Sequence, residues 1–149
     1  MSDIKEGIFE VDSPEETLEF AKEFAKQLNP GDVIALIGDL GVGKTAFTKG
    51  VAVSLGIDED IVSPTFTIIC EHTDGDIPLY HMDVYRIEDE DELFEIGFED
   101  YLYGDGITII EWADLIPESM PEKYVRILIE KDLEKGVNHR RITITKVDR

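Results

Sequence analysis

The residues with the clearest chemical capacity form a glycine-rich segment that ends in a lysine and a threonine. Residues 38–45 read Gly-Asp-Leu-Gly-Val-Gly-Lys-Thr. This order satisfies G-x-x-x-x-G-K-[ST], the P-loop, in which main-chain amides surround a phosphate. A chance match is rare, because glycine makes up only about 7% of residues in ordinary proteins. The segment therefore predicts a site for the phosphates of a nucleotide with Mg²⁺.

We expect the loop and the first turn of the helix after it to hold the nucleotide. The N-terminus of that helix directs its positive end toward the same phosphate. Lys44 is expected to bridge the β- and γ-phosphates, and the Thr45 hydroxyl to hold Mg²⁺. The expected nucleotide contacts are Asp39, Leu40, Gly41, Val42, Gly43, Lys44, Thr45 and Ala46.

Two acids are candidates for the metal side of this site. Asp83 lies in an expected strand, and Glu111 directly follows the apolar run 107–110, at the carboxyl end where ligands gather in α/β sheets. Either acid could bind Mg²⁺, directly or through water, or orient the attacking water. Each could also be a solvated acid in a chain with 34 Asp and Glu. The candidate catalytic residues are Lys44, Glu111 and Asp83, and the candidate metal ligands are Thr45, Glu111 and Asp83.

Two further residues have weaker functional signals. Thr65, in Ser-Pro-Thr-Phe, follows the P-loop helix, where a mobile segment that senses the γ-phosphate is common, but a turn that begins a strand explains it equally well. Trp112 follows Glu111 and could shield the site from water or simply pack. Residues 13–17 are a candidate for the adenine side, because a capped helix start could lie near the purine.

Periodicity and turn signals predict the elements that position these residues. The apolar runs 33–37 and 107–110 are typical of strands covered on both faces. Helices are expected over 18–28, 44–55 and 88–102, and other strands over 8–11, 65–70, 78–85, 125–129 and 141–147. We expect an α/β P-loop NTPase fold in one domain, residues 1–149. Its mixed, mainly parallel central sheet would be flanked by helices and end in an antiparallel C-terminal hairpin.

The charge is strongly negative. Fourteen Lys and Arg against 34 Asp and Glu give a net charge of −20. Such a surface repels phosphate backbones, which argues against a DNA-binding protein, direct tRNA binding or a membrane-surface protein. One cysteine and no apolar run near the roughly 20 residues of a membrane span predict a cytoplasmic protein. The acidic run 88–92 is either a solvated helix start or a docking face for a basic partner.

ATP is favoured over GTP. Residues 145–148, Thr-Lys-Val-Asp, match the [NT]-K-x-D pattern that reads guanine, but only Arg149 follows them to complete a base pocket. The D-x-x-G switch is also missing, because Arg86 stands three residues after Asp83.

Several motifs together resemble one family, TsaE, the small bacterial ATPases of threonylcarbamoyladenosine formation in tRNA. The matching segments are the P-loop, Ser-Pro-Thr-Phe at 63–66, His-Met-Asp-Val-Tyr-Arg at 81–86, Glu-Ile-Gly-Phe-Glu-Asp-Tyr-Leu at 95–102 and Ile-Glu-Trp at 110–112. The resemblance implies a weak ATPase that works with TsaB and TsaD, which modify adenosine 37 of tRNAs that read ANN codons. It also implies that Glu111 is the acid on the metal side of the site and that Asp83 is Walker-B-like. The resemblance further implies that the chain contacts tRNA only indirectly, through the complex with TsaB and TsaD.

Two alternatives remain, a small-molecule kinase and a nucleotide-binding module without useful hydrolysis. Kinases of this size usually close an arginine-bearing lid over the phosphates, whereas Arg126 is the only arginine between Arg86 and Arg140. The small number of arginines also predicts slow hydrolysis by the chain alone, because few cations are present to stabilise the transition state at the γ-phosphate. An arginine that a partner supplies for this purpose can raise the rate by roughly 10³–10⁵-fold.

Overall fold

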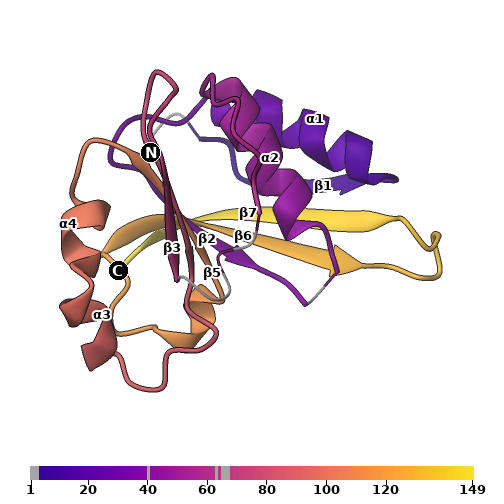
Figure 1. Ribbon diagram of the computed structural model, residues 1–149. Coiled ribbons are helices and arrows are strands. Elements are labelled where there is room, and N and C mark those ends of the chain that lie inside the picture. The colour runs from indigo at the N-terminus through magenta and orange to yellow at the C-terminus, as the bar shows by residue number, and fades with distance from the viewer. Residues whose placement is uncertain (1–3, 40, 63, 65–67) are drawn as a thin grey trace.

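A seven-stranded mixed sheet organises the protein. The computed structural model describes residues 4–39, 41–62, 64 and 68–149. The strand order is β1-β7-β6-β2-β5-β4-β3 (Figure 1). The strands are β1 (Gly7–Val11), β2 (Val33–Ile37), β3 (Ile69–His72), β4 (Leu79–Asp83), β5 (Ile107–Glu111), β6 (Lys123–Lys131) and β7 (Arg140–Asp148).

The four central strands are parallel, and antiparallel strands complete both edges. β2 pairs with β5 on one side and β6 on the other, and β4 extends the parallel set beyond β5. β3 pairs antiparallel with β4, and β7 pairs antiparallel with both β6 and β1. The carboxyl ends of β2, β4 and β5 therefore meet at one edge of the sheet. The mixed sheet with a C-terminal antiparallel hairpin is the predicted fold.

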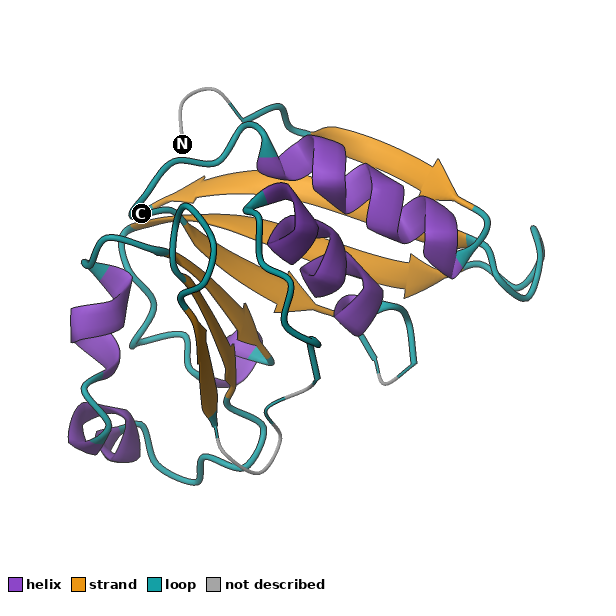
Figure 2. Cartoon of the chain, turned by 45° about the horizontal axis from the view of Figure 1, so that its top comes forward, coloured by secondary structure: helices purple, strands orange, loops and turns teal. Residues whose placement is uncertain are grey.

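Helices α1 (Pro14–Ala25) and α2 (Lys44–Ser54) lie side by side over one face of the sheet (Figure 2). α1 begins as its sequence predicts, because Ser13 accepts a hydrogen bond from the Glu16 amide and Pro14 occupies the first turn. Phe24 and Phe47 join the two helices, with ring centroids 5.7 Å apart. These contacts fix the start of α2 over the carboxyl end of β2.

The predicted helix over 88–102 is wrong as a single helix. The structure has two short helices, α3 (Asp91–Glu95) and α4 (Phe98–Leu102), on the other side of the sheet (Figure 1). Gly97 separates them with φ +75, a left-handed conformation that ends an α-helix. Leu93 and Phe98 are buried, whereas Phe94 is 84% exposed.

Other differences concern the ends of elements. β3 begins at Ile69 and continues to His72, whereas a strand was expected over 65–70, of which residues 65–67 lie outside the described part. β6 and β7 are each longer than the predicted hairpin strands. Residues 145–148 lie within β7, near the amino-terminal ends of the parallel strands and away from the P-loop. This position agrees with their rejection as a guanine-reading loop.

No helix in the described ranges is long and apolar enough to cross a membrane. A short 3₁₀ turn (Ala113–Leu115) follows β5 and completes the part of the fold beside the predicted site.

Candidate functional site

The P-loop connects β2 to α2 at the carboxyl edge of the sheet. Gly43, immediately before the helix, has φ +110, which only glycine adopts without strain. Gly38 is required for a different reason. A Cβ there would lie 2.7 Å from the Ile129 carbonyl oxygen, so the loop must pass close to β6. The two glycines thus fix both the conformation of the loop and its approach to the sheet.

The Lys44 side chain is buried and its charge is not hydrogen-bonded. Only 6% of the residue is exposed, and Nζ has no hydrogen-bond partner among the described residues. Nζ lies 4.1 Å from the centre of the Trp112 ring and 3.9 Å from Glu111 Oε1. A buried ammonium without a hydrogen bond is costly, so the arrangement favours an added acceptor.

The Glu111 carboxylate is shared between Lys44 and His81. Its second oxygen, Oε2, lies 2.6 Å from His81 Nε2. The sheet register explains this contact, because His81 is paired with Ile109, two residues before Glu111, and side chains two apart share one face. His81 is fully buried and Glu111 is 3% exposed. His81 therefore fixes one oxygen of the carboxylate and leaves the other directed toward Lys44.

Burial lowers the pKa of Lys44 below its usual 10.5. Four carboxylates oppose this effect and favour the ammonium: Glu111 most strongly, then Asp83, Asp114 and Asp39. The loss of hydration lowers the pKa of Lys44 more than the four neighbouring carboxylates raise it. An anionic ligand with a counter-cation would restore polar contacts to both the lysine and the carboxylates.

Asp83 stands beside Glu111 at the ends of neighbouring parallel strands. The two residues are register partners in β4 and β5, and Asp83 is 4% exposed. Asp83 Oδ1 accepts a hydrogen bond of 2.9 Å from the Tyr85 amide, and the Tyr85 ring packs on Trp112 with centroids 4.8 Å apart. The structure thus brings Lys44, Glu111, Asp83 and Trp112 together, as the sequence predicts.

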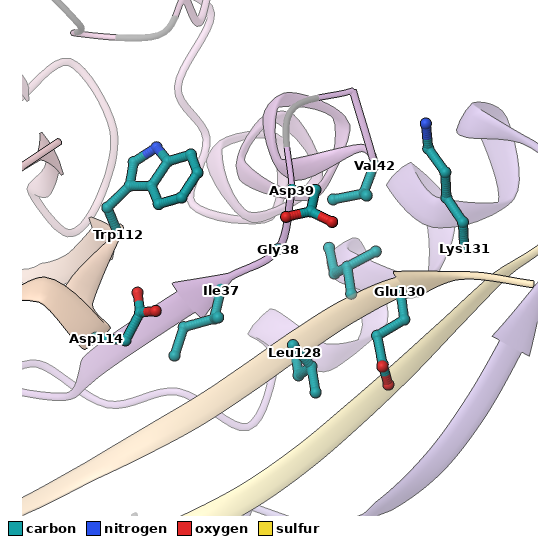
Figure 3. Close-up of a pocket in the computed structure, with 10 residues that line it drawn as sticks. Ile37, Gly38, Asp39, Val42, Trp112, Asp114, Leu128, Glu130 and Lys131 are labelled. Carbon is teal, nitrogen blue, oxygen red and sulfur yellow. The ribbon is translucent and has the colours of Figure 1, made fainter.

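A pocket of about 330 Å³ opens beside the P-loop (Figure 3). Asp39 and Val42 border it from the loop, with Trp112 and Asp114 to one side and Glu130 and Lys131, from the end of β6, to the other (Figure 3). A smaller pocket of about 60 Å³ lies on another side of the loop, between Gly41–Gly43, Pro14, Thr17, Asn138 and Arg140. The helix start named as a candidate for the adenine side therefore does border the P-loop.

Two predicted residues, Leu40 and Thr65, lie outside the described residues, as does Ser63. Thr45 and Ala46 occupy the first turn of α2, as predicted. No partner at metal-ligand spacing accompanies His81 in the sequence, which predicts a structural residue or one that supports a site residue, and its contact with Glu111 agrees with that prediction. Sequence reasoning missed Arg140, which reaches the P-loop from 98 residues away.

The donor set fits a nucleotide phosphate with Mg²⁺. The buried, unpartnered Lys44 Nζ matches an anion, and the left-handed Gly43 precedes a free helix N-terminus. Within the described ranges, no group of three or more His, Cys, Asp or Glu is arranged to hold a metal. Glu111 and Asp83, paired at the ends of β5 and β4, offer the one or two carboxylates with which proteins usually bind Mg²⁺ together with substrate phosphates.

The chain matches one family model over residues 11–142, described as "Threonylcarbamoyl adenosine biosynthesis protein TsaE". It is 51% identical over 135 residues to the tRNA threonylcarbamoyladenosine biosynthesis protein TsaE of Bacillus subtilis (strain 168), covering 91% of this chain and 82% of the relative. The protein of the same name from Treponema pallidum (strain Nichols) is 41% identical over 115 residues, 77% of this chain and 84% of the relative.

A solved structure has the same fold. The crystal structure of YdiB from Bacillus subtilis superposes with a TM-score of 0.79 at 42% sequence identity. The match covers 97% of this chain and 87% of the other. With the P-loop geometry, the family model and these relatives in agreement, the chain belongs to the TsaE family of threonylcarbamoyl adenosine biosynthesis proteins.

Proposed function

We propose that this chain binds Mg-ATP, hydrolyses it slowly and thereby supports TsaB and TsaD in forming threonylcarbamoyladenosine at position 37 of ANN-decoding tRNAs. One observation carries the nucleotide part. The buried Nζ of Lys44, in a P-loop, has no hydrogen bond among the described residues and lies 3.9 Å from a carboxylate that His81 holds in place. The names of the relatives support the role in tRNA modification.

The residues have distinct tasks in this proposal. Lys44 binds the terminal phosphates, and Thr45 with Glu111 or Asp83 holds Mg²⁺, which neutralises phosphate charge when bound. Glu111 orients water with the oxygen that does not face His81. Trp112 covers Lys44 and limits the access of bulk water. The chain acts in the cytoplasm as one domain and does not itself transfer the threonylcarbamoyl group.

The partner dependence rests on the small number of arginines, which are five in the whole sequence. The charges that affect Lys44 most strongly are those of four acids. Arg140 touches the P-loop through a main-chain carbonyl rather than from the side of Lys44. A partner that supplies a cation would therefore accelerate hydrolysis, by roughly 10³-fold or more where such help is direct.

Phosphate release from Mg-ATP, measured for the chain alone and with purified TsaB and TsaD, tests this proposal. We expect a slow basal rate that rises when both partners are present. A fast basal rate that ignores the partners would contradict the proposal and favour a kinase, to be sought with a screen of small-molecule phosphate acceptors. Stable ATP binding with no turnover in either condition would favour a regulatory module.

The variant Glu111→Gln separates binding from hydrolysis. It keeps the shape of the side chain and removes the negative charge, so we expect nucleotide affinity to stay within about threefold while turnover falls by roughly 10²-fold or more. Affinity is read from the fluorescence of Trp112, the only tryptophan in the chain. The matched control is Glu118→Gln at an exposed position, which should retain wild-type turnover.

A further inference from the structure

Arg140, at the start of β7, is joined to the P-loop by a hydrogen bond. Its Nε donates to the Val42 carbonyl oxygen at 3.0 Å. Its Nη1 donates to the carbonyl oxygens of Val137 and His139, each at 2.9 Å. The guanidinium therefore links the end of the β6–β7 hairpin to the loop, using three main-chain acceptors.

The hairpin end is itself attached to the chain segment before α1. His139 Nδ1 lies 2.5 Å from Asp12 Oδ1, and its Nε2 lies 3.0 Å from Glu10 Oε1. Lys135 Nζ makes a second contact with Glu10 Oε1, at 2.7 Å. These contacts restrain the hairpin end that precedes Arg140, and the position of its guanidinium beside the P-loop is therefore restrained as well.

The hydrogen bond from Arg140 to the Val42 carbonyl oxygen also affects the Gly43 amide, because both belong to one peptide group. A trans peptide group is planar, and its C=O and N–H point in opposite directions. The Val42 carbonyl and the Gly43 N–H belong to one such group. When Arg140 holds the carbonyl on one side, the Gly43 N–H is directed to the opposite side of the peptide group.

We infer that Arg140 is a positioning residue for the P-loop, which orients the Val42–Gly43 peptide so that the Gly43 amide is ready to bind a nucleotide phosphate. Glycine needs this support, because Gly43 lacks a side chain that would restrict rotation of the peptide. Its φ of +110 is a conformation that the neighbouring contacts must select. The inference rests on the proposed nucleotide binding and adds a residue outside the P-loop motif.

ADP affinity, measured from Trp112 fluorescence, tests the inference with three variants. Arg140→Gln removes the charge-assisted hydrogen bond, and we expect the Kd for ADP to rise about tenfold or more. Arg140→Lys keeps one donor and should recover most of the affinity. Arg141→Gln is the matched control, because it removes the same charge from the next residue, whose Nη2 faces Asp132 at 3.5 Å; its Kd should stay near that of the wild type.

Two further measurements distinguish a positioning role of Arg140 from an effect on folding and from a general effect of lost positive charge. At saturating ATP the turnover number of Arg140→Gln should fall less than its ADP affinity, because Lys44, Thr45 and Glu111 are intact, whereas Arg141→Gln, whose side chain faces Asp132, should keep the wild-type turnover number. In the ¹H–¹⁵N NMR spectrum, the Gly43 amide should shift and broaden in Arg140→Gln while the resonances of the sheet stay in place, and thermal unfolding should match that of Arg141→Gln.

Specific results would overturn the inference. Wild-type ADP affinity in Arg140→Gln, or an equal loss in Arg141→Gln, would show that the contact does not position the loop. A Kd change that follows a drop in thermal stability, with the Gly43 resonance unmoved, would assign Arg140 a structural role only. If the wild-type protein itself fails to bind ADP, the proposed function fails instead, and the NMR comparison still reports whether Arg140 orders Gly43.

Discussion

At the residue scale, the candidate site depends on how one carboxylate is shared. Glu111 faces Lys44 with one oxygen and His81 with the other. Because all three side chains are buried, each lost contact leaves a polar group without water to replace it. His81 thus restricts the rotation of Glu111, and Glu111 in turn keeps the ammonium of Lys44 near the P-loop.

The variant His81→Ala should therefore weaken both stability and turnover. It removes the hydrogen bond to Glu111 and leaves a cavity at a fully buried position, so we expect the free energy of unfolding to fall by about 2–4 kcal/mol. Turnover should fall more than ADP affinity, because Glu111 is no longer oriented. Urea denaturation followed by circular dichroism gives the first quantity, and phosphate release gives the second.

A double-mutant cycle with Glu111→Gln checks the physical reason. If the loss comes from the buried contact, His81→Ala should cost less stability when Glu111 is already neutral. Strictly additive losses would contradict the proposed coupling and leave the cavity as the only cause.

The residues of the site could be predicted only where a local motif names them. Lys44 and Thr45 follow from the P-loop, and Glu111 from its position after an apolar run. The partnership of His81 with Glu111 depends on the register of β4 against β5, which no local pattern specifies. The contact of Arg140 with Val42 joins segments 98 residues apart, so tertiary structure alone reveals it.

At the element scale, the β6–β7 hairpin does more than extend the sheet. β6 provides the backbone that packs against Gly38, and the residue after the turn, Arg140, contacts Val42. His139 connects the same turn to β1 through Glu10 and to the start of α1 through Asp12. The hairpin, β1, α1 and the P-loop are therefore joined by polar contacts at one edge of the molecule.

This cluster predicts a pH dependence of stability. Both ring nitrogens of His139 face carboxylates, and only the protonated ring can donate from both, so Asp12 first and then Glu10 raise the pKa of His139 above 6.5. A raised folded-state pKa means that the stabilisation is present below pH 6.5 and is lost as pH rises through the folded value. Lys135 first, and then His139, lower the pKa of Glu10 from 4.5 to about 2, so its contribution is complete above pH 4.5 and is lost as the pH falls toward 2.

The measurement compares wild type with His139→Gln by urea unfolding at about pH 5.5 and about pH 9. We expect the wild type to be the more stable protein at the lower pH and the difference to shrink at the higher pH. A difference that does not change with pH would show that the imidazolium contributes nothing to the hairpin contacts.

The elements themselves could be predicted where a hydrophobic pattern is continuous. β2 has its predicted bounds, and β5 extends the predicted run by one residue, because both are buried parallel strands with uninterrupted apolar runs. Over 88–102 the apolar residues suggest one helix, but Gly97 takes a left-handed conformation and breaks it. The backbone preference of one residue thus overrides the periodicity of fifteen.

At the scale of the whole molecule, the net charge of −20 limits what the chain binds directly. Several of its cations are already engaged with acids, among them Lys22 with Glu19, Lys26 with Glu23, and Lys135 with Glu10. Binding to nucleic acid draws its affinity from free cations that displace counterions from phosphates. An acidic surface with engaged cations offers little of this, whereas it does suit a basic protein partner.

We therefore expect no saturable binding of tRNA to the chain alone at about 0.15 M salt. Fluorescence anisotropy of a labelled ANN-decoding tRNA measures this directly, and the same titration with TsaB and TsaD present is the control that the tRNA is competent. Lower salt should not rescue binding by the chain alone, because weaker screening strengthens the repulsion between like charges. Tight binding by the isolated chain would mean that a local basic surface outweighs the net charge, and tRNA would then be a direct ligand rather than one reached through the partner proteins.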